Sequence, residues 1–148
     1  MATIATVERN LHIVQVLKRI ALARQEGRVL TADPFLKAGR MSFKDLVSKV
    51  APLCGHDPVL ASDLTSVVKR RNYLCHDFWY DNVNATLADE SRKVLLTELL
   101  RDAETFEDIN DRLVQTAVDP NMEALGLDPD VGMSITLAFL KAHAEQNK

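Results

Sequence analysis

The feature that most constrains the fold of this chain is an apolar period of three to four residues, repeated in several long segments. The first of these, residues 4–25, carries one apolar stripe and a second apolar group beside it: Val7, Leu11, Val14, Leu17 and Ala21, with Ile13, Val16 and Ile20. This spacing predicts an amphipathic helix that is buried on two sides, in a bundle or in a dimer. Gly27 is expected to end it.

Capping residues predict where the next two helices begin. Ser42 and Asp45 resemble a capping box and open a short helix over residues 42–53. A longer helix over residues 58–80 follows an aspartate N-cap and has Pro58 at its first position.

The third long segment, residues 87–118, predicts a long helix. Its inward stripe is expected to consist of Leu96, Leu99, Ala103, Phe106, Ile109 and Leu113. Pro120 is expected to stop this helix, and Gly126 to end a short piece after it, before a last helix over residues 128–144. No segment shows the alternation of apolar and polar residues that is typical of paired β-strands. We therefore expect one all-α domain, residues 1–148, folded as an antiparallel bundle of four to five helices.

Composition places the chain in an ordinary class. Hydrophobic residues make up 47% and charged residues 26%, as in globular proteins. No apolar run approaches the length that spans a bilayer, and the N-terminus lacks a secretion signal. Two cysteines are too few for a disulfide framework. The expected location is the cytoplasm, with no membrane partner.

The net charge of −3 combines two unequal halves. Residues 1–74 hold 12 Lys and Arg against 6 Asp and Glu, whereas residues 75–148 hold 6 against 15. An anionic ligand would be attracted to the first half. In the alternative interpretation, the two halves neutralise each other across helix faces.

An arginine, an amide and a histidine fall close together in the helix over residues 58–80. They are Arg71, Asn72 and His76. Arg71 also occupies a position in an apolar stripe: Leu60, Leu64, Val67, Arg71, Leu74 and Phe78. Because a buried cation is costly unless it is paired, Arg71 is expected to be largely buried and hydrogen-bonded. Its expected partner is a backbone carbonyl or a carboxylate, either Asp63 or one from the long acidic helix.

Arg71, Asn72 and His76 resemble the motif of the HEPN superfamily, in which an arginine and a polar residue precede a histidine by a short interval. The resemblance implies a HEPN-like fold and a metal-independent endoribonuclease of toxin–antitoxin or defence type. In that role His76 would exchange protons with the ribose 2′-hydroxyl or the leaving oxygen, and Arg71 would stabilise the phosphate charge. Asn72 would orient the histidine or a phosphate oxygen. The implied partners are RNA, a second copy of the chain and an antitoxin or other regulatory protein.

Helix geometry adds constraints to this site. Lys69, Asn72 and His76 share a face, whereas Arg71 lies about 140° from His76 on an ideal α-helix. A helix end or a second subunit would bring these two together, which favours a homodimer with a composite site.

Four further residues are candidates for binding RNA: Lys69, Arg70, Trp79 and Tyr80. In the alternative interpretation, Lys69 and Arg70 form a solvated face, and Trp79 and Phe78 belong to the core or an interface.

One position departs from the family pattern. The toxins controlled by a nucleotidyltransferase antitoxin have a tyrosine two residues after the histidine, and this chain has Phe78 there. Modification at that position is therefore not expected.

Two alternatives to an enzyme remain. One is a catalytically silent interaction module in which Arg71 and His76 form a structural polar network, and the other is a regulator that binds RNA or a nucleotide. No cofactor is expected. No metal site is expected either, because Cys75 and His76 are adjacent and point about 100° apart on a helix, and Cys54 and His56 lack a usual zinc spacing.

Overall fold

The computed structural model describes residues 4–29, 41–55 and 57–128, and the single positions 130, 134 and 138. The α-helices are α1 (Ile4–Gln25), α3 (Phe43–Val50), α4 (Pro58–Asn72), α5 (Phe78–Asn82), α6 (Asp89–Leu113) and α7 (Asp119–Ala124). Two 3₁₀ turns and two π-helical turns connect them: η1 (Ala51–Cys54), η2 (Tyr73–Asp77), η3 (Ala85–Leu87) and η4 (Val114–Val118). No strand occurs within these residues, so the described part of the protein is all-α, as expected.

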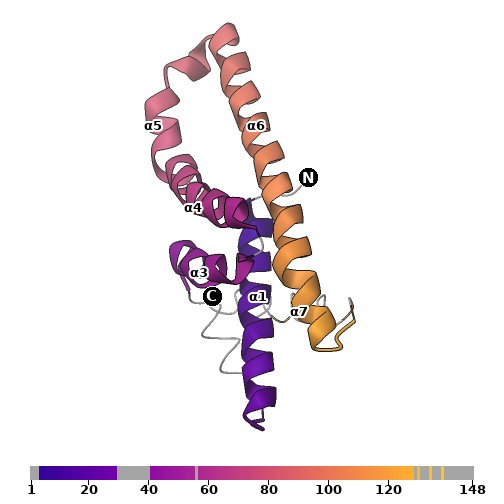
Figure 1. Cartoon of the computed structure of the whole chain (residues 1–148). Coiled ribbons are helices and arrows are strands. Elements are labelled where there is room, and N and C mark those ends of the chain that lie inside the picture. The colour runs from indigo at the N-terminus through magenta and orange to yellow at the C-terminus, as the bar shows by residue number, and fades with distance from the viewer. Residues whose placement is uncertain are drawn as a thin grey trace.

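The second half of α6 lies beside α1, and α3 and α4 cross this pair (Figure 1). α3 packs on α1, α4 packs on both α3 and α6, and η4 and α7 return to α1. α5 continues beyond α4, and α6 runs back from the far end of this extension toward α1 (Figure 1). We call this projecting hairpin, residues 78–100, the arm.

The central part of helix α1 is buried on all sides. Every residue from Asn10 to Leu17 is buried, including Ile13 and Val16 of the second apolar group. A buried hydrogen bond joins α1 to α6, since Asn10 Nδ2 donates to Asn110 Oδ1 at 2.7 Å. The prediction of more than one buried face is confirmed, and a single chain is sufficient to cover both faces.

Local capping agrees with the sequence. The backbone N–H of Asp45 donates to Ser42 Oγ at 3.1 Å, and the N–H of Leu60 donates to Asp57 Oδ1 at 2.8 Å. Gly27 ends α1 with φ of 63°, a conformation that glycine adopts without steric cost. These contacts satisfy backbone groups that helix ends leave without partners.

The prediction that Pro120 stops the long helix is wrong. α6 passes through η4 into α7, and the N–H of Asp119 donates to the Val114 carbonyl oxygen. Pro120 has no N–H, and the widened π turn before it accommodates the ring that a regular α-helix would exclude. Asn121 Nδ2 donates to the Ala117 carbonyl oxygen at 2.5 Å and satisfies an acceptor there. The expected last helix, residues 128–144, falls almost entirely outside the described residues.

The predicted register of the long helix is wrong at its first position. Leu95 is buried at 9% exposure, whereas Leu96 is 58% exposed. The inward stripe of α6 runs through Leu95, Leu99, Phe106, Ile109 and Leu113, and both Asp102 and the predicted Ala103 are half-buried between Leu99 and Phe106. A carboxylate, Asp102, therefore takes a place that a leucine or phenylalanine takes elsewhere in the stripe.

This register predicts unequal effects of two neighbouring truncations. Leu95→Ala should lower the free energy of unfolding by about 2–3 kcal/mol, because it removes buried methyl groups. Leu96→Ala, the matched control, should change it by less than about 0.5 kcal/mol. Urea unfolding of both variants measures the difference, and equal losses or the reverse order would contradict the register.

Candidate functional site

The motif residues lie where α4 widens into the π turn η2. α4 ends at Asn72, and the N–H of Phe78 then donates to the Tyr73 carbonyl oxygen, five residues back. His76 is carried by this turn. Single π turns within α-helices are rare and occur frequently at functional sites.

The widened turn changes the angle between Arg71 and His76. A turn closed by an i→i+5 bond contains more residues than an α turn, so each residue advances through a smaller angle. The two side chains are therefore closer in direction than the roughly 140° of a regular α-helix. A second subunit is not needed to reduce this divergence.

The motif side chains face solvent. Asn72, His76 and Lys69 are exposed, and Arg71 is half-buried. Arg71 Nη1 donates to Asn72 Oδ1 at 3.2 Å. Within the described part of the chain, no hydrogen bond or ion pair joins the His76 imidazole to another residue.

The prediction that Arg71 is buried against a carboxylate is wrong, because the neighbouring Arg70 takes that role. Arg70 Nε donates to both carboxylate oxygens of Asp102 at 2.9 Å, and Nη2 donates to Asp102 Oδ2 at 2.7 Å and to Glu98 Oε1 at 2.5 Å. The hydrogen bonds to Asp102 and, to a smaller extent, to Glu98 raise the pKa of the Arg70 guanidinium. Its side chain is 28% exposed. The interpretation of Arg70 as part of a solvated face is therefore wrong as well, and its guanidinium is occupied by carboxylates.

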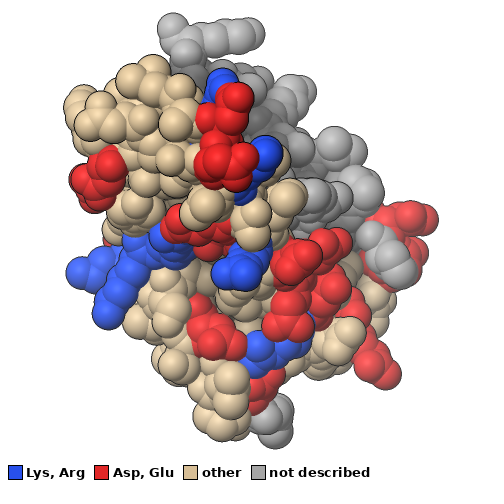
Figure 2. Space-filling view, turned by 90° about the horizontal axis from the view of Figure 1, so that it is seen from above, with Lys and Arg blue, Asp and Glu red and all other residues tan. Residues whose placement is uncertain are grey.

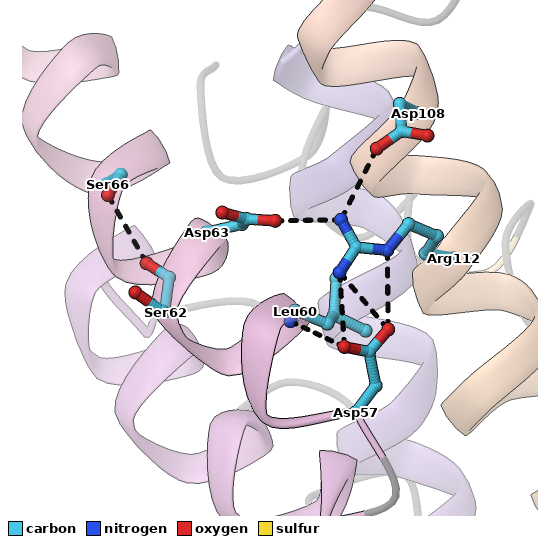
Figure 3. A network of polar contacts seen from close by, with 7 residues as sticks. All are labelled: Asp57, Leu60, Ser62, Asp63, Ser66, Asp108 and Arg112. Atoms are coloured by element: carbon cyan, nitrogen blue, oxygen red, sulfur yellow. Dashed lines mark hydrogen bonds and ion pairs between the residues drawn. The ribbon is translucent and has the colours of Figure 1, made fainter.

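A second arginine ties the other end of α4 to α6. Arg112 Nη1 donates to Asp63 Oδ2 at 2.7 Å, and Nη2 contacts Asp57 Oδ2 at 3.1 Å (Figure 3). Asp108 also accepts from Arg112 at 3.3 Å. The hydrogen bond from the N–H of Leu60 is the main cause that lowers the pKa of the Asp57 carboxyl, and Arg112 lowers it further. Asp63, one of the carboxylates expected to pair with Arg71, is thus occupied by Arg112.

The aromatic residues after the histidine divide into buried and exposed positions. Phe78 is buried at 3% exposure, whereas Trp79 is 66% and Tyr80 is 86% exposed. The rings of Phe78 and Trp79 meet edge to face with centroids 5.3 Å apart. For Phe78, burial agrees with the interpretation as a core or interface residue, whereas Trp79 presents much of its indole to solvent and is not a core residue.

The surface around the site carries charges of both signs. On the face seen in Figure 2, basic side chains form small groups beside acidic ones, with no continuous basic patch over the described residues. A small cleft of about 110 Å³ lies between α4 and α6, and Asp63, Ser66, Arg70 and Asp102 are among its lining residues. None of the three motif residues lines it.

Two further searches concern only the residues that the structure describes. No group of three or more His, Cys, Asp or Glu side chains there could hold a metal ion. No helix there is both long and apolar enough to cross a bilayer.

Comparison of the chain with models of known families, with curated proteins and with solved structures finds no match. The site must therefore be interpreted from its own geometry.

Sequence reasoning missed Asp102, Arg112 and the π turn. Asp102 could have been found, because it stands four residues before Phe106 and three after Leu99, in step with the inward stripe. An inward carboxylate requires a cation, and Arg70 lies in the last turn of α4. The π turn has no comparable signal in the residue pattern.

The two adjacent arginines should differ in their effect on stability. Arg70→Ala leaves Asp102 without its charged partner, so it should lower the free energy of unfolding by about 1–3 kcal/mol. Arg71→Ala, the matched control, should cost less than about 0.5 kcal/mol. Chemical denaturation distinguishes them, and a larger loss for Arg71→Ala would contradict the assignment of the ion pair to Arg70.

Proposed function

We propose that this protein is a HEPN-like, metal-independent endoribonuclease of toxin–antitoxin or defence type. One observation carries the proposal: Arg71 and His76 lie on or next to a π turn, both accessible to solvent, and no carboxylate among residues 4–29, 41–55 and 57–128 pairs with Arg71. A permanent cation beside a group that exchanges protons near neutral pH suits cleavage of a phosphodiester.

The reaction uses the RNA's own hydroxyl as nucleophile. His76 accepts the proton of the ribose 2′-hydroxyl, the 2′-oxygen attacks phosphorus, and the bond to the leaving 5′-oxygen breaks. A proton returned to that oxygen completes the step and yields a 2′,3′-cyclic phosphate and a 5′-hydroxyl. Arg71 stabilises the negative charge that develops on the phosphate oxygens. Asn72, which accepts from Arg71, orients the guanidinium or a phosphate oxygen.

RNA binding is assigned to exposed residues on either side of the turn. Lys69 supplies a charge for the backbone, and the exposed rings of Trp79 and Tyr80 offer surfaces on which bases can stack. The direct role first expected of Arg70 is less well supported, because its guanidinium holds Asp102 and Glu98. We assign Arg70 to support of the site.

The partners we propose are a second copy of the chain and an antitoxin or other regulatory protein, in the cytoplasm. The support comes from the arm, whose exposed apolar side chains are Trp79, Tyr80, Val83, Leu87, Val94, Leu96 and Leu100. Exposed apolar groups in such number on one hairpin are typical of an interface. The same observation favours the second candidate, a catalytically silent interaction module that uses the arm alone.

Cleavage of RNA should be independent of metal ions. The wild-type protein is expected to release products that end in 2′,3′-cyclic phosphate or 3′-phosphate, and a chelator should not slow it. His76→Ala and Arg71→Ala should each lower the rate at least about 100-fold, because each removes a group that acts in the transition state. Gel analysis of end-labelled RNA, with product ends checked by mass spectrometry, measures both effects.

Substrates and variants provide the controls. An oligonucleotide with a 2′-deoxyribose at the scissile position should resist cleavage, because the nucleophile is missing. Glu107→Gln, a change at an exposed position of α6 that has no part in the proposed site, should retain the catalytic rate. Activity that survives both His76→Ala and Arg71→Ala, or that requires added magnesium, contradicts the proposal.

A further inference from the structure

The π turn that carries His76 is bridged by side chains that meet beside it. Asn82 Nδ2 donates to the Phe78 carbonyl oxygen at 2.8 Å and to Tyr73 Oη at 3.0 Å. The Tyr73 and Phe78 rings meet edge to face, with centroids 6.0 Å apart. Tyr73 is the first residue of the turn and Phe78 follows its last residue, so these contacts join the two ends of the turn.

The same tyrosine is attached to α6 through Arg70. The Arg70 guanidinium carbon lies 4.9 Å from the centre of the Tyr73 ring, within the range of a cation–π contact. Arg70 is held in turn by Asp102 and Glu98 of α6. A chain of contacts therefore runs from α6 through Arg70 and Tyr73 to Asn82.

A turn of this kind needs support from outside its own backbone. π turns are rare in helices. The backbone of such a turn can return to α-helical hydrogen bonding, in which each N–H donates to the carbonyl oxygen four residues back and not five. The contacts of Tyr73 and Asn82 oppose that change, because they are made with Tyr73 and Phe78 placed as the five-residue hydrogen bond of the π turn places them. His76 lies inside this interval, so its backbone position depends on the turn.

We infer that Tyr73 and Asn82 are positioning residues that hold the π turn in its widened form and so place the His76 imidazole relative to Arg71. This inference rests on the proposed function for its consequence in catalysis, but its structural part does not. Neither residue belongs to the motif that the sequence points to. Their role is to fix the direction of His76, and neither acts on the substrate.

Two substitutions separate the hydroxyl from the ring. Tyr73→Phe keeps the ring that contacts Phe78 and Arg70 and removes only the oxygen that accepts from Asn82. Asn82→Ala removes both of the hydrogen bonds that Asn82 donates. Tyr80→Phe is the matched control, because it deletes a hydroxyl from a neighbouring tyrosine that is 86% exposed.

The first measurement needs no RNA. By NMR, the backbone amide of Phe78 should exchange with solvent about fivefold faster in Tyr73→Phe, the effect of losing one hydrogen bond, and faster still in Asn82→Ala. The imidazole resonances of His76 should shift in both variants, whereas the amide of Leu17 in the core should keep its exchange rate. Tyr80→Phe should change none of these. Unchanged exchange and resonances in Tyr73→Phe and Asn82→Ala, or an equal acceleration at Leu17, would overturn the inference.

The second measurement tests the consequence for catalysis. Tyr73→Phe should lower kcat for RNA cleavage about tenfold and leave KM nearly unchanged, because a displaced imidazole affects the chemical step. A changed KM with an unchanged kcat would overturn the positioning role. If the wild-type protein cleaves no RNA, the proposed function fails, and the exchange and resonance data still decide whether Tyr73 and Asn82 hold the turn.

Discussion

The ion pair between Arg70 and Asp102 is the interaction on which the geometry of the motif depends. Asp102 faces inward from α6, where its carboxylate would be costly without a cation. Arg70 supplies that cation from the last turn of α4, with three hydrogen bonds of 2.7–2.9 Å. The pair therefore fixes the end of α4 against α6 directly before the chain widens into η2.

This pairing also determines which arginine is available to a ligand. Consecutive residues on an α-helix point about 100° apart, so Arg71 points away from the direction in which Arg70 reaches α6. The Arg71 guanidinium then donates a hydrogen bond to the amide oxygen of Asn72, and no ion pair joins it to a carboxylate among the described residues. Arg112 holds the far end of α4 through Asp57 and Asp63, and the helix is secured at both ends while its motif remains accessible.

Much of the fold could be predicted from the sequence, because caps and breakers act locally. The start of α4 at Asp57 and the end of α1 at Gly27 are examples. The register of α6 was missed because Leu95 and Leu96 are adjacent and equally apolar, so the period alone cannot choose between them. The continuation past Pro120 and the nature of the motif turn were missed for a common reason: a π turn depends on contacts such as those of Tyr73 and Asn82, and local propensity does not report them.

A double-mutant cycle between Arg70 and Asp102 tests most directly whether this pair organises the site. Urea unfolding of the wild type, Arg70→Ala, Asp102→Ala and the double variant gives the coupling free energy. The account predicts a stabilising coupling of about 1–3 kcal/mol for this half-buried pair, and a coupling near zero in the parallel cycle between Arg71 and Asp102. A coupling near zero for Arg70 and Asp102, or a larger one for Arg71, would contradict it.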